Sequence, residues 1–153
     1  EIADGDWSSD VCSSDLMVNP DVLHRRLKKL DEYLDYLEDA QRYSYREFAN
    51  DPEHHGSVER FLHLSIEALT DMASHVVADD DLGSVDRARD LPGIFVEHGY
   101  VDDELAATWK DMIGFRNVLV HEYVDIDSER VYDVLQNHLD EIRRLRRVFG
   151  HFL

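Results

Sequence analysis

The chain has 153 residues, of which 34 are acidic and 16 are basic, and its formal net charge is −18. This length suffices for one domain with its own hydrophobic core, and no apolar run approaches the roughly 18–20 residues that a membrane-spanning helix requires. The negative charge argues against general binding of nucleic acid, which depends on basic patches, so any RNA site would have to be local.

The first sixteen residues differ from the rest of the chain. They contain five acidic and no basic side chains, and they have no usable apolar period. We therefore expect a non-native or disordered leader at 1–16 and a single domain at 17–153. The strong acidity, with only three lysines among the sixteen basic residues, suggests a halophilic source. Because Cys12 is the only cysteine, no intrachain disulfide can form, which suits a cytoplasmic protein.

The first predicted helix begins with Asn19 as its N-cap and Pro20 at its first helical position. Leucines then recur at steps of three and four residues and predict a face that packs in the core. The members of this stripe are Leu23, Leu27, Leu30, Leu34 and Leu37. Four tyrosines in and after this segment could stack on bases, although such residues more often pack with their hydroxyls at the surface. They are Tyr33, Tyr36, Tyr43 and Tyr45.

A second helix is predicted from the cap and proline at Asp51 and Pro52, or from beyond Gly56, to about Ala78. One of its faces carries a polar stripe of Arg60, His63, Glu67, Asp71 and His75. Carboxylates and histidines on a bundle helix can bind metals, but di-iron bundles repeat a Glu-x-x-His spacing on paired helices, and no second such motif occurs here. We expect a solvated or supporting face, with Arg60, Asp71 and His75 as supporting residues of a site.

The next two helices are shorter or less regular in pattern. A third helix is predicted from a Ser84 cap to about His98, with a kink or break at Pro92. Gly99 should end it, and a fourth helix should open at Asp102 or Asp103.

A fifth helix should start at a Ser128 cap and continue to the end of the chain. Its apolar stripe consists of Val131, Leu135, Ile142, Leu145 and Phe149. Its last turns are the most basic part of the chain, an ordinary complement to the helix dipole. Together these segments predict an all-α, up-and-down bundle of about five helices, of a size that commonly forms two-fold dimers.

The fourth helix contains a charge where the apolar period requires a core residue. Leu105, Trp109 and Met112 recur at helical spacing, and the next positions in the series are Arg116 and Leu119. Because an unpaired buried guanidinium is costly, Arg116 needs either a partner or a cleft that uses its charge.

Three further polar residues, Asn117, His121 and Tyr123, follow Arg116 within seven positions. On an ideal helix Asn117 and His121 share one face, Arg116 and Tyr123 share another, and Arg116 and His121 diverge by about 140°. They could meet if the helix unwinds near His121 or if two protomers present them across a two-fold axis. Arginine can bind a phosphate, histidine can transfer a proton, and asparagine can orient either group, a set that suits phosphodiester cleavage without metal.

The block Gly-Phe-Arg-Asn-Val-Leu-Val-His-Glu-Tyr at 114–123 resembles the Arg-x4-His-x-Tyr signature of the HepT-like toxins, in the HEPN superfamily of helical ribonucleases. The segments at 58–68, 71–75 and 131–135 resemble other helices of that family, and the resemblance covers most of 17–153. His63 departs from the pattern, because the family often has glutamine there.

The resemblance implies a metal-independent endoribonuclease with no cofactor, the toxin of a type VII-like HEPN/MNT toxin–antitoxin pair. It implies that Arg116 and His121 are catalytic, that Asn117 supports them, and that two protomers form a shared cleft. It also implies a minimal nucleotidyltransferase antitoxin that transfers AMP to Tyr123. An alternative is a non-catalytic helical module that binds a nucleotide or a nucleotidyltransferase partner, and a metal-dependent bundle enzyme is a more distant one.

Overall fold

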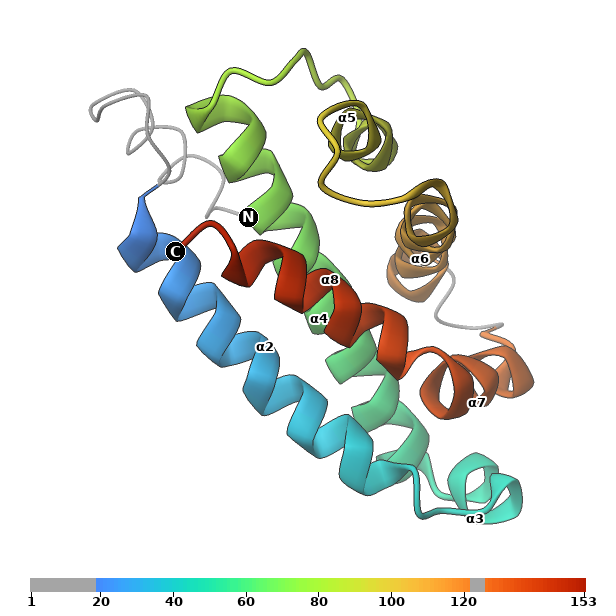
Figure 1. Cartoon of the computed structure of the whole chain (residues 1–153). Coiled ribbons are helices and arrows are strands. Elements are labelled where there is room, and N and C mark those ends of the chain that lie inside the picture. Colours follow the sequence, from blue (N-terminus) through green and yellow to red (C-terminus); the bar gives the residue numbers. More distant parts are fainter. Residues whose placement is uncertain (1–18, 122–125) are drawn as a thin grey trace.

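The computed structural model describes residues 19–121 and 126–153, and these form a bundle of helices without a strand (Figure 1). The leader at 1–16 lies outside the described residues. The elements are α2 (Pro20–Ala40), α3 (Tyr45–Asn50), α4 (Pro52–Asp79), the short 3-10 helix η1 (Ala88–Asp90), α5 (Leu91–Glu97), α6 (Asp103–His121), α7 (Ser128–Asn137) and α8 (Leu139–Gly150). The prediction of an all-α bundle is confirmed, and none of the described helices is long and apolar enough to cross a membrane.

The two long helices start where their caps predicted. The Asn19 side chain accepts a hydrogen bond from the backbone N–H of Asp21 at 3.0 Å. Asp51 accepts one from Glu53 in the same way at 2.9 Å, so α4 begins at Pro52 rather than beyond Gly56. Capping satisfies backbone donors that a helix start otherwise leaves unpaired.

Helix α3 was not predicted, although the sequence contains a helix start signal for it. Ser44 and Glu47 form a capping box, in which the Ser44 hydroxyl accepts from the Glu47 N–H and the Glu47 carboxylate accepts from the Ser44 N–H. Reciprocal capping of this kind stabilises even one helical turn or two. Phe48 of this helix is fully buried and ties it to the core.

The predicted third helix is shorter than expected. Ser84 does not cap a helix, because the chain from 83 to 87 is irregular and η1 precedes α5. Pro92 lies in the first turn of α5, where its missing N–H costs nothing, so it helps to start the helix instead of kinking it. Gly99, with a φ of +75°, lies just beyond the end of α5, and Asp102 caps α6 by accepting from the Leu105 N–H at 2.7 Å.

The predicted fifth helix is two helices. At His138 the backbone turns away from helical geometry, with φ −124° and ψ 7°, and separates α7 from α8. Asp127, rather than Ser128, is the residue whose side chain caps α7. The break leaves the predicted apolar stripe intact, because each of its five members is buried.

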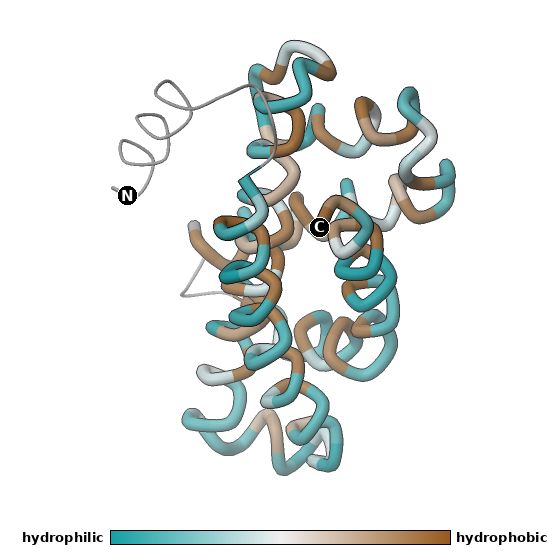
Figure 2. Tube along the Cα trace, turned by 60° about the vertical axis from the view of Figure 1, so that its left-hand side comes forward, coloured by the Kyte–Doolittle hydropathy of each residue, from teal (hydrophilic) through white to brown (hydrophobic). Residues whose placement is uncertain are grey.

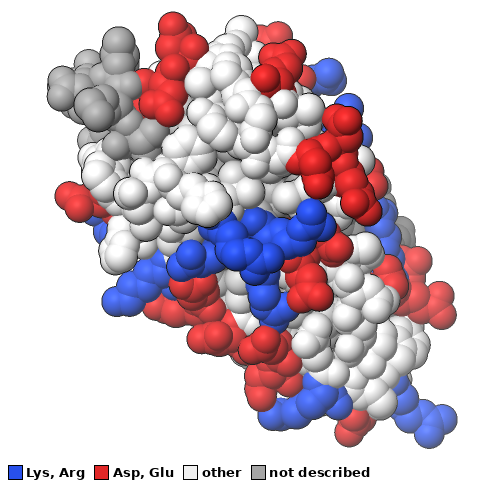
Figure 3. Space-filling view, in the orientation of Figure 1, with Lys and Arg blue, Asp and Glu red and all other residues white. Residues whose placement is uncertain are grey.

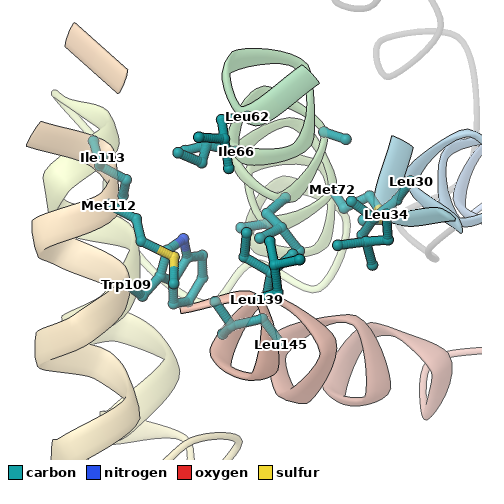
Figure 4. Packing of buried hydrophobic residues seen from close by; sticks show 14 of the residues in the cluster. Leu30, Leu34, Leu62, Ile66, Met72, Trp109, Met112, Ile113, Leu139 and Leu145 are labelled. Atoms are coloured by element: carbon teal, nitrogen blue, oxygen red, sulfur yellow. The ribbon is translucent and has the colours of Figure 1, made fainter. Parts of the chain in front are cut away.

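Helix α4 is the centre of the bundle and packs against each of the other six described α-helices. Figure 4 shows apolar side chains from α2, α4, α6 and α8 meeting in one core, with Trp109 of α6 fully buried. Along the tube in Figure 2 the helices carry both apolar and polar positions, the pattern of amphipathic helices around a shared interior. On the face of α6 that packs against α4, a residue is therefore exposed only at the edge of this core.

Candidate functional site

The misplaced arginine of α6 has a partner on α4. Arg116 Nε donates to Glu67 Oε1 at 2.6 Å, and its Nη2 lies 2.6 Å from the same oxygen. The side chains are 29% and 36% exposed, so the pair lies at the rim of the core rather than inside it. Of the two alternatives for this charge, a partner or a cleft, the structure shows a partner. It also explains how α6 can keep an arginine at this position without burying an unpaired charge.

Asn117 extends this contact along α6. Its side-chain oxygen accepts a hydrogen bond from Arg116 Nη1 at 3.0 Å, while the asparagine itself is exposed. Glu67 and Asn117 thus hold the guanidinium from two directions. A guanidinium fixed in this way is pre-organised to bind an anion that approaches from solvent.

His63 lies one helical turn before Glu67 on α4. Its Nε2 is 3.6 Å from Glu67 Oε1, the same oxygen that binds Arg116. Partial burial lowers the pKa of His63 below its ordinary value, and the cations of Arg116 and Arg60 lower it further, whereas Glu67 acts in the opposite direction. His63 is therefore held neutral beside a cationic site at neutral pH.

A groove between α2 and α4 adjoins this cluster. Its volume is about 350 Å³, and Glu67 forms part of its wall. Asp71 lies in the same wall and pairs with Arg26 of α2, whose Nη1 donates to Asp71 Oδ2 at 3.1 Å. Asp71 is thus on the side of α4 that carries the cluster, and it forms an ion pair with α2. Its supporting role stays a prediction.

His75, the third member of the predicted supporting set, is in a different environment. It is 3% exposed, and its Nε2 lies 3.0 Å from Oδ2 of Asp79, which is also buried. Burial raises the pKa of the Asp79 carboxyl, while the neighbouring His75 lowers it. His75 is therefore buried, and the expectation of a solvated face is wrong at this position. Its supporting role stays a prediction.

The later part of the Arg-x4-His-x-Tyr motif lies outside the described residues. His121 is the last residue of α6, but its side chain lies outside the described part of the structure, as does Tyr123. The structure therefore brings together Arg116 and Asn117 with Glu67 and His63. Whether Arg116 and His121 converge stays a prediction. Arg60 is exposed on α4 and contributes to the cationic surroundings of His63.

The basic end of the chain is largely neutralised by α2. Arg146 makes two hydrogen bonds to Asp31, at 3.0 and 2.9 Å, and Arg143 contacts Glu38 at 2.6 Å. Figure 3 shows a cationic patch on the face that α8 covers, with acidic atoms below it and to its right and uncharged residues above it. These contacts pack α8 on α2 and occupy two of the arginines of α8.

Glu67 and His63 are the site residues that the sequence reading did not select. Both lie in the polar stripe of α4, at i and i+4. The negative charge of Glu67 could have identified it. An arginine in the apolar stripe of one helix needs a carboxylate on a neighbouring helix. Among the described residues, no three His, Cys, Asp or Glu side chains are grouped as metal ligands would be.

Comparison with known proteins relates the chain to one protein family. A family model described as Ribonuclease HepT-like matches residues 27–149. The mRNA nuclease HepT of Shewanella oneidensis is 30% identical over 78 residues, which make up 51% of this chain and 59% of that protein. The tRNA nuclease HepT of Aphanizomenon flos-aquae is 30% identical over 139 residues, 89% of this chain and 92% of that protein. The match thus spans less than two thirds of the first relative and nearly all of the second.

The fold is also found among solved structures. A tri-AMPylated Shewanella oneidensis HEPN toxin, in complex with an MNT antitoxin, superposes with a TM-score of 0.79 at 23% identity. The superposition covers 86% of this chain and 98% of that chain. At this level of identity the likeness shows a shared fold.

Proposed function

The chain belongs to the Ribonuclease HepT-like family, and from this premise we propose that it is an endoribonuclease, the toxin of an HEPN/MNT toxin–antitoxin pair. The observation that carries the proposal is Arg116, held by Glu67 and Asn117 at the start of the Arg-x4-His-x-Tyr motif. The two relatives described as HepT nucleases support RNA as the substrate.

The proposed chemistry requires no metal ion. Arg116 binds the scissile phosphate and stabilises the charge that develops on its oxygens in the transition state. His121 transfers the proton, because histidine titrates near neutral pH: it accepts the 2′-hydroxyl proton as the 2′-oxygen attacks phosphorus, or returns a proton to the leaving 5′-oxygen. Asn117 keeps the guanidinium in place through its contact with Nη1.

Two protomers complete the proposed site. Arg116 and His121 diverge on an ideal helix, so a homodimer that presents both motifs across a two-fold axis would supply both groups to one phosphate. A dimer also suits a small bundle whose α6 carries the site at its surface.

We further propose that a minimal nucleotidyltransferase antitoxin silences the toxin by transferring AMP to Tyr123. The tri-AMPylated HEPN toxin bound to its MNT antitoxin supports this form of control. AMP attached near Arg116 would offer its phosphate to the guanidinium and so compete with RNA.

The test is cleavage of a labelled RNA by the purified full chain, with and without EDTA. Wild type should cleave in both conditions, and His121→Ala and Arg116→Ala should reduce the rate by at least about a hundredfold. Asn117→Ala should cause a smaller loss. Cleavage that disappears with EDTA would refute metal independence, and full activity of His121→Ala would remove His121 from the mechanism.

The same experiment separates the alternative function. A chain that binds RNA or the nucleotidyltransferase but never cleaves, in wild type as in His121→Ala, would be a non-catalytic binding module. Mass spectrometry after expression with a cognate nucleotidyltransferase tests the proposed control. AMP-sized additions should appear in wild type and be absent from Tyr123→Phe, and an unmodified wild type would contradict this part of the proposal.

A further inference from the structure

The groove between α2 and α4 gathers several cations in an acidic chain. We call it the α2–α4 groove. It is lined by Val22, Arg25, Arg26, Lys29 and Tyr33 of α2, and by Leu64, Glu67, Ala68 and Asp71 of α4. Three of these nine residues are cations, in a protein whose net charge is −18. Cations gathered in one hollow of such a protein mark a local site for an anion.

The carboxylates of the groove are already neutralised. Asp71 pairs with Arg26 at 3.1 Å, and Glu67 pairs with Arg116 at 2.6 Å. When the ion-pair partners Arg116 and Glu32 are counted with the lining residues, four cations face three carboxylates, and the local charge is +1. The excess resides on Arg25, and Arg25 and Lys29 are both exposed.

These two cations are accessible to a ligand. Arg25 forms no ion pair with any residue in the described ranges, 19–121 and 126–153. Lys29 has a contact of 3.5 Å with Glu32, in which both side chains are more than half exposed. An exposed pair of this length contributes little free energy, so an incoming phosphate can replace it. Arg25 and Lys29 lie at i and i+4, one turn apart on the same face of α2.

Glu67 joins the groove to the proposed cleavage centre. One carboxylate lines the groove and also binds Arg116 through Oε1. A strand whose scissile phosphate lies on Arg116 would therefore have the groove beside it. By contrast, Arg143 and Arg146 of α8 are occupied by carboxylates of α2.

Tyr33 provides an aromatic surface in the same groove. It is half-buried, and its ring centroid lies 5.7 Å from that of Phe61. Proteins that bind single strands combine a cationic track for the backbone with aromatic rings for the bases.

We propose that the α2–α4 groove binds the RNA strand next to the scissile phosphate. Arg25 and Lys29 bind backbone phosphates, and Tyr33 stacks on a base. This inference rests on the proposed ribonuclease function and specifies how its substrate is held. It assigns α2 to substrate binding and leaves the chemistry to α6.

The experiment measures binding and cleavage separately. Binding of a fluorescein-labelled single-stranded oligoribonucleotide is followed by anisotropy in the His121→Ala background, which prevents turnover. Adding R25E and K29E should weaken binding at least about tenfold and lower the salt slope of log K by roughly one to two, because about 0.7 counterions are released per single-strand phosphate contact. In the active background, the same double variant should raise KM and leave kcat within about threefold.

The control is a double charge reversal with the same change in net charge. R46E/R147E changes two exposed arginines on α3 and α8, neither of which lines the groove. It should alter oligoribonucleotide binding by less than about threefold. Equal losses in the two double variants would overturn the inference, because they would show an effect of net charge alone. Unchanged RNA binding in R25E/K29E, together with a changed oligomeric state or lost nucleotidyltransferase binding, would also overturn it.

Failure of the inference and failure of the proposed function give different results. If wild type cleaves RNA and R25E/K29E binds as the control does, the groove is not an RNA site and the ribonuclease stands. If wild type does not cleave, the anisotropy assay alone tests whether the groove binds RNA. For Tyr33, Phe should retain binding and Leu should weaken it several-fold; equal binding of both variants would remove the stacking contact.

Discussion

Glu67 and Arg116 join the centre of the bundle to the motif helix through one carboxylate oxygen, which lies 2.6 Å from both Nε and Nη2 of the arginine. This contact spans 49 positions of the sequence. The third guanidinium nitrogen, Nη1, donates a hydrogen bond to Asn117. The guanidinium therefore lies between α4 and the exposed face of α6. Glu67 is therefore a positioning residue for the proposed site, since it acts through Arg116.

Glu67→Gln tests this role. Glutamine keeps the size of the side chain but removes the counter-charge, so the guanidinium should become less well oriented, and we expect kcat for RNA cleavage to fall about tenfold or more. Both partners are about a third exposed, so the free energy of unfolding should change by less than about 1 kcal/mol. Steady-state cleavage and urea unfolding measure the two effects. Glu97→Gln, on the exposed face of α5, is the matched control, and an equal kcat for both variants would rule out a positioning role.

His63 should make stability depend on pH in a defined direction. Its pKa is lowered in the folded chain, chiefly by burial, so below about pH 6.5 the unfolded chain takes up a proton more readily than the folded one. Wild type should therefore lose stability relative to His63→Gln as the pH falls below 6.5, whereas the difference should be constant above about pH 7. Urea unfolding of both proteins at pH 7.5, 6.5 and 5.5 measures this difference. A difference that stays the same at all three values would contradict the lowered pKa.

The buried pair of His75 and Asp79 should contribute to stability rather than to activity. Asp79→Ala removes one partner of a contact of 3.0 Å whose side chains are 4% and 3% exposed. The cost of leaving the other partner buried is about 2–3 kcal/mol in the free energy of unfolding. Thermal or urea unfolding measures it, with the exposed neighbour variant Asp80→Ala as control. A loss no larger than that of the control would show that the pair is energetically unimportant.

Two glycines should respond to alanine with opposite signs. An added Cβ would meet no atom within 4 Å at either Gly56 or Gly99, so packing does not decide the outcome. Gly56 lies within α4, where alanine should stabilise by roughly 0.5–1 kcal/mol. Gly99 has a φ of +75°, and alanine there should destabilise by roughly 1 kcal/mol or more. Urea unfolding of both variants tests this, and effects of the same sign would contradict the backbone argument.

Local chemistry explains which parts of the fold were predictable from the sequence. The caps at Asn19, Asp51 and Asp102 act within three residues, and the leucine stripe of α2 needs only the period of one helix. The errors also have local causes. Pro92 can either kink a helix or start one, and the sequence pattern does not distinguish these cases. The break at His138 interrupts no apolar period, because α7 and α8 keep the same stripe buried.

The sequence by itself determined that the chain is a helical bundle and that Arg116 is out of place in an apolar stripe, because helical period and the cost of an unpaired charge are properties of a single segment. Only the tertiary structure decided that Glu67 is its partner, that His75 is buried with Asp79, and that Arg25 and Lys29 line a groove beside the site. These contacts depend on how α2, α4 and α6 pack against one another. Glu67 and Arg116, which pair across that packing, are 49 positions apart in the chain, and no periodic pattern relates them.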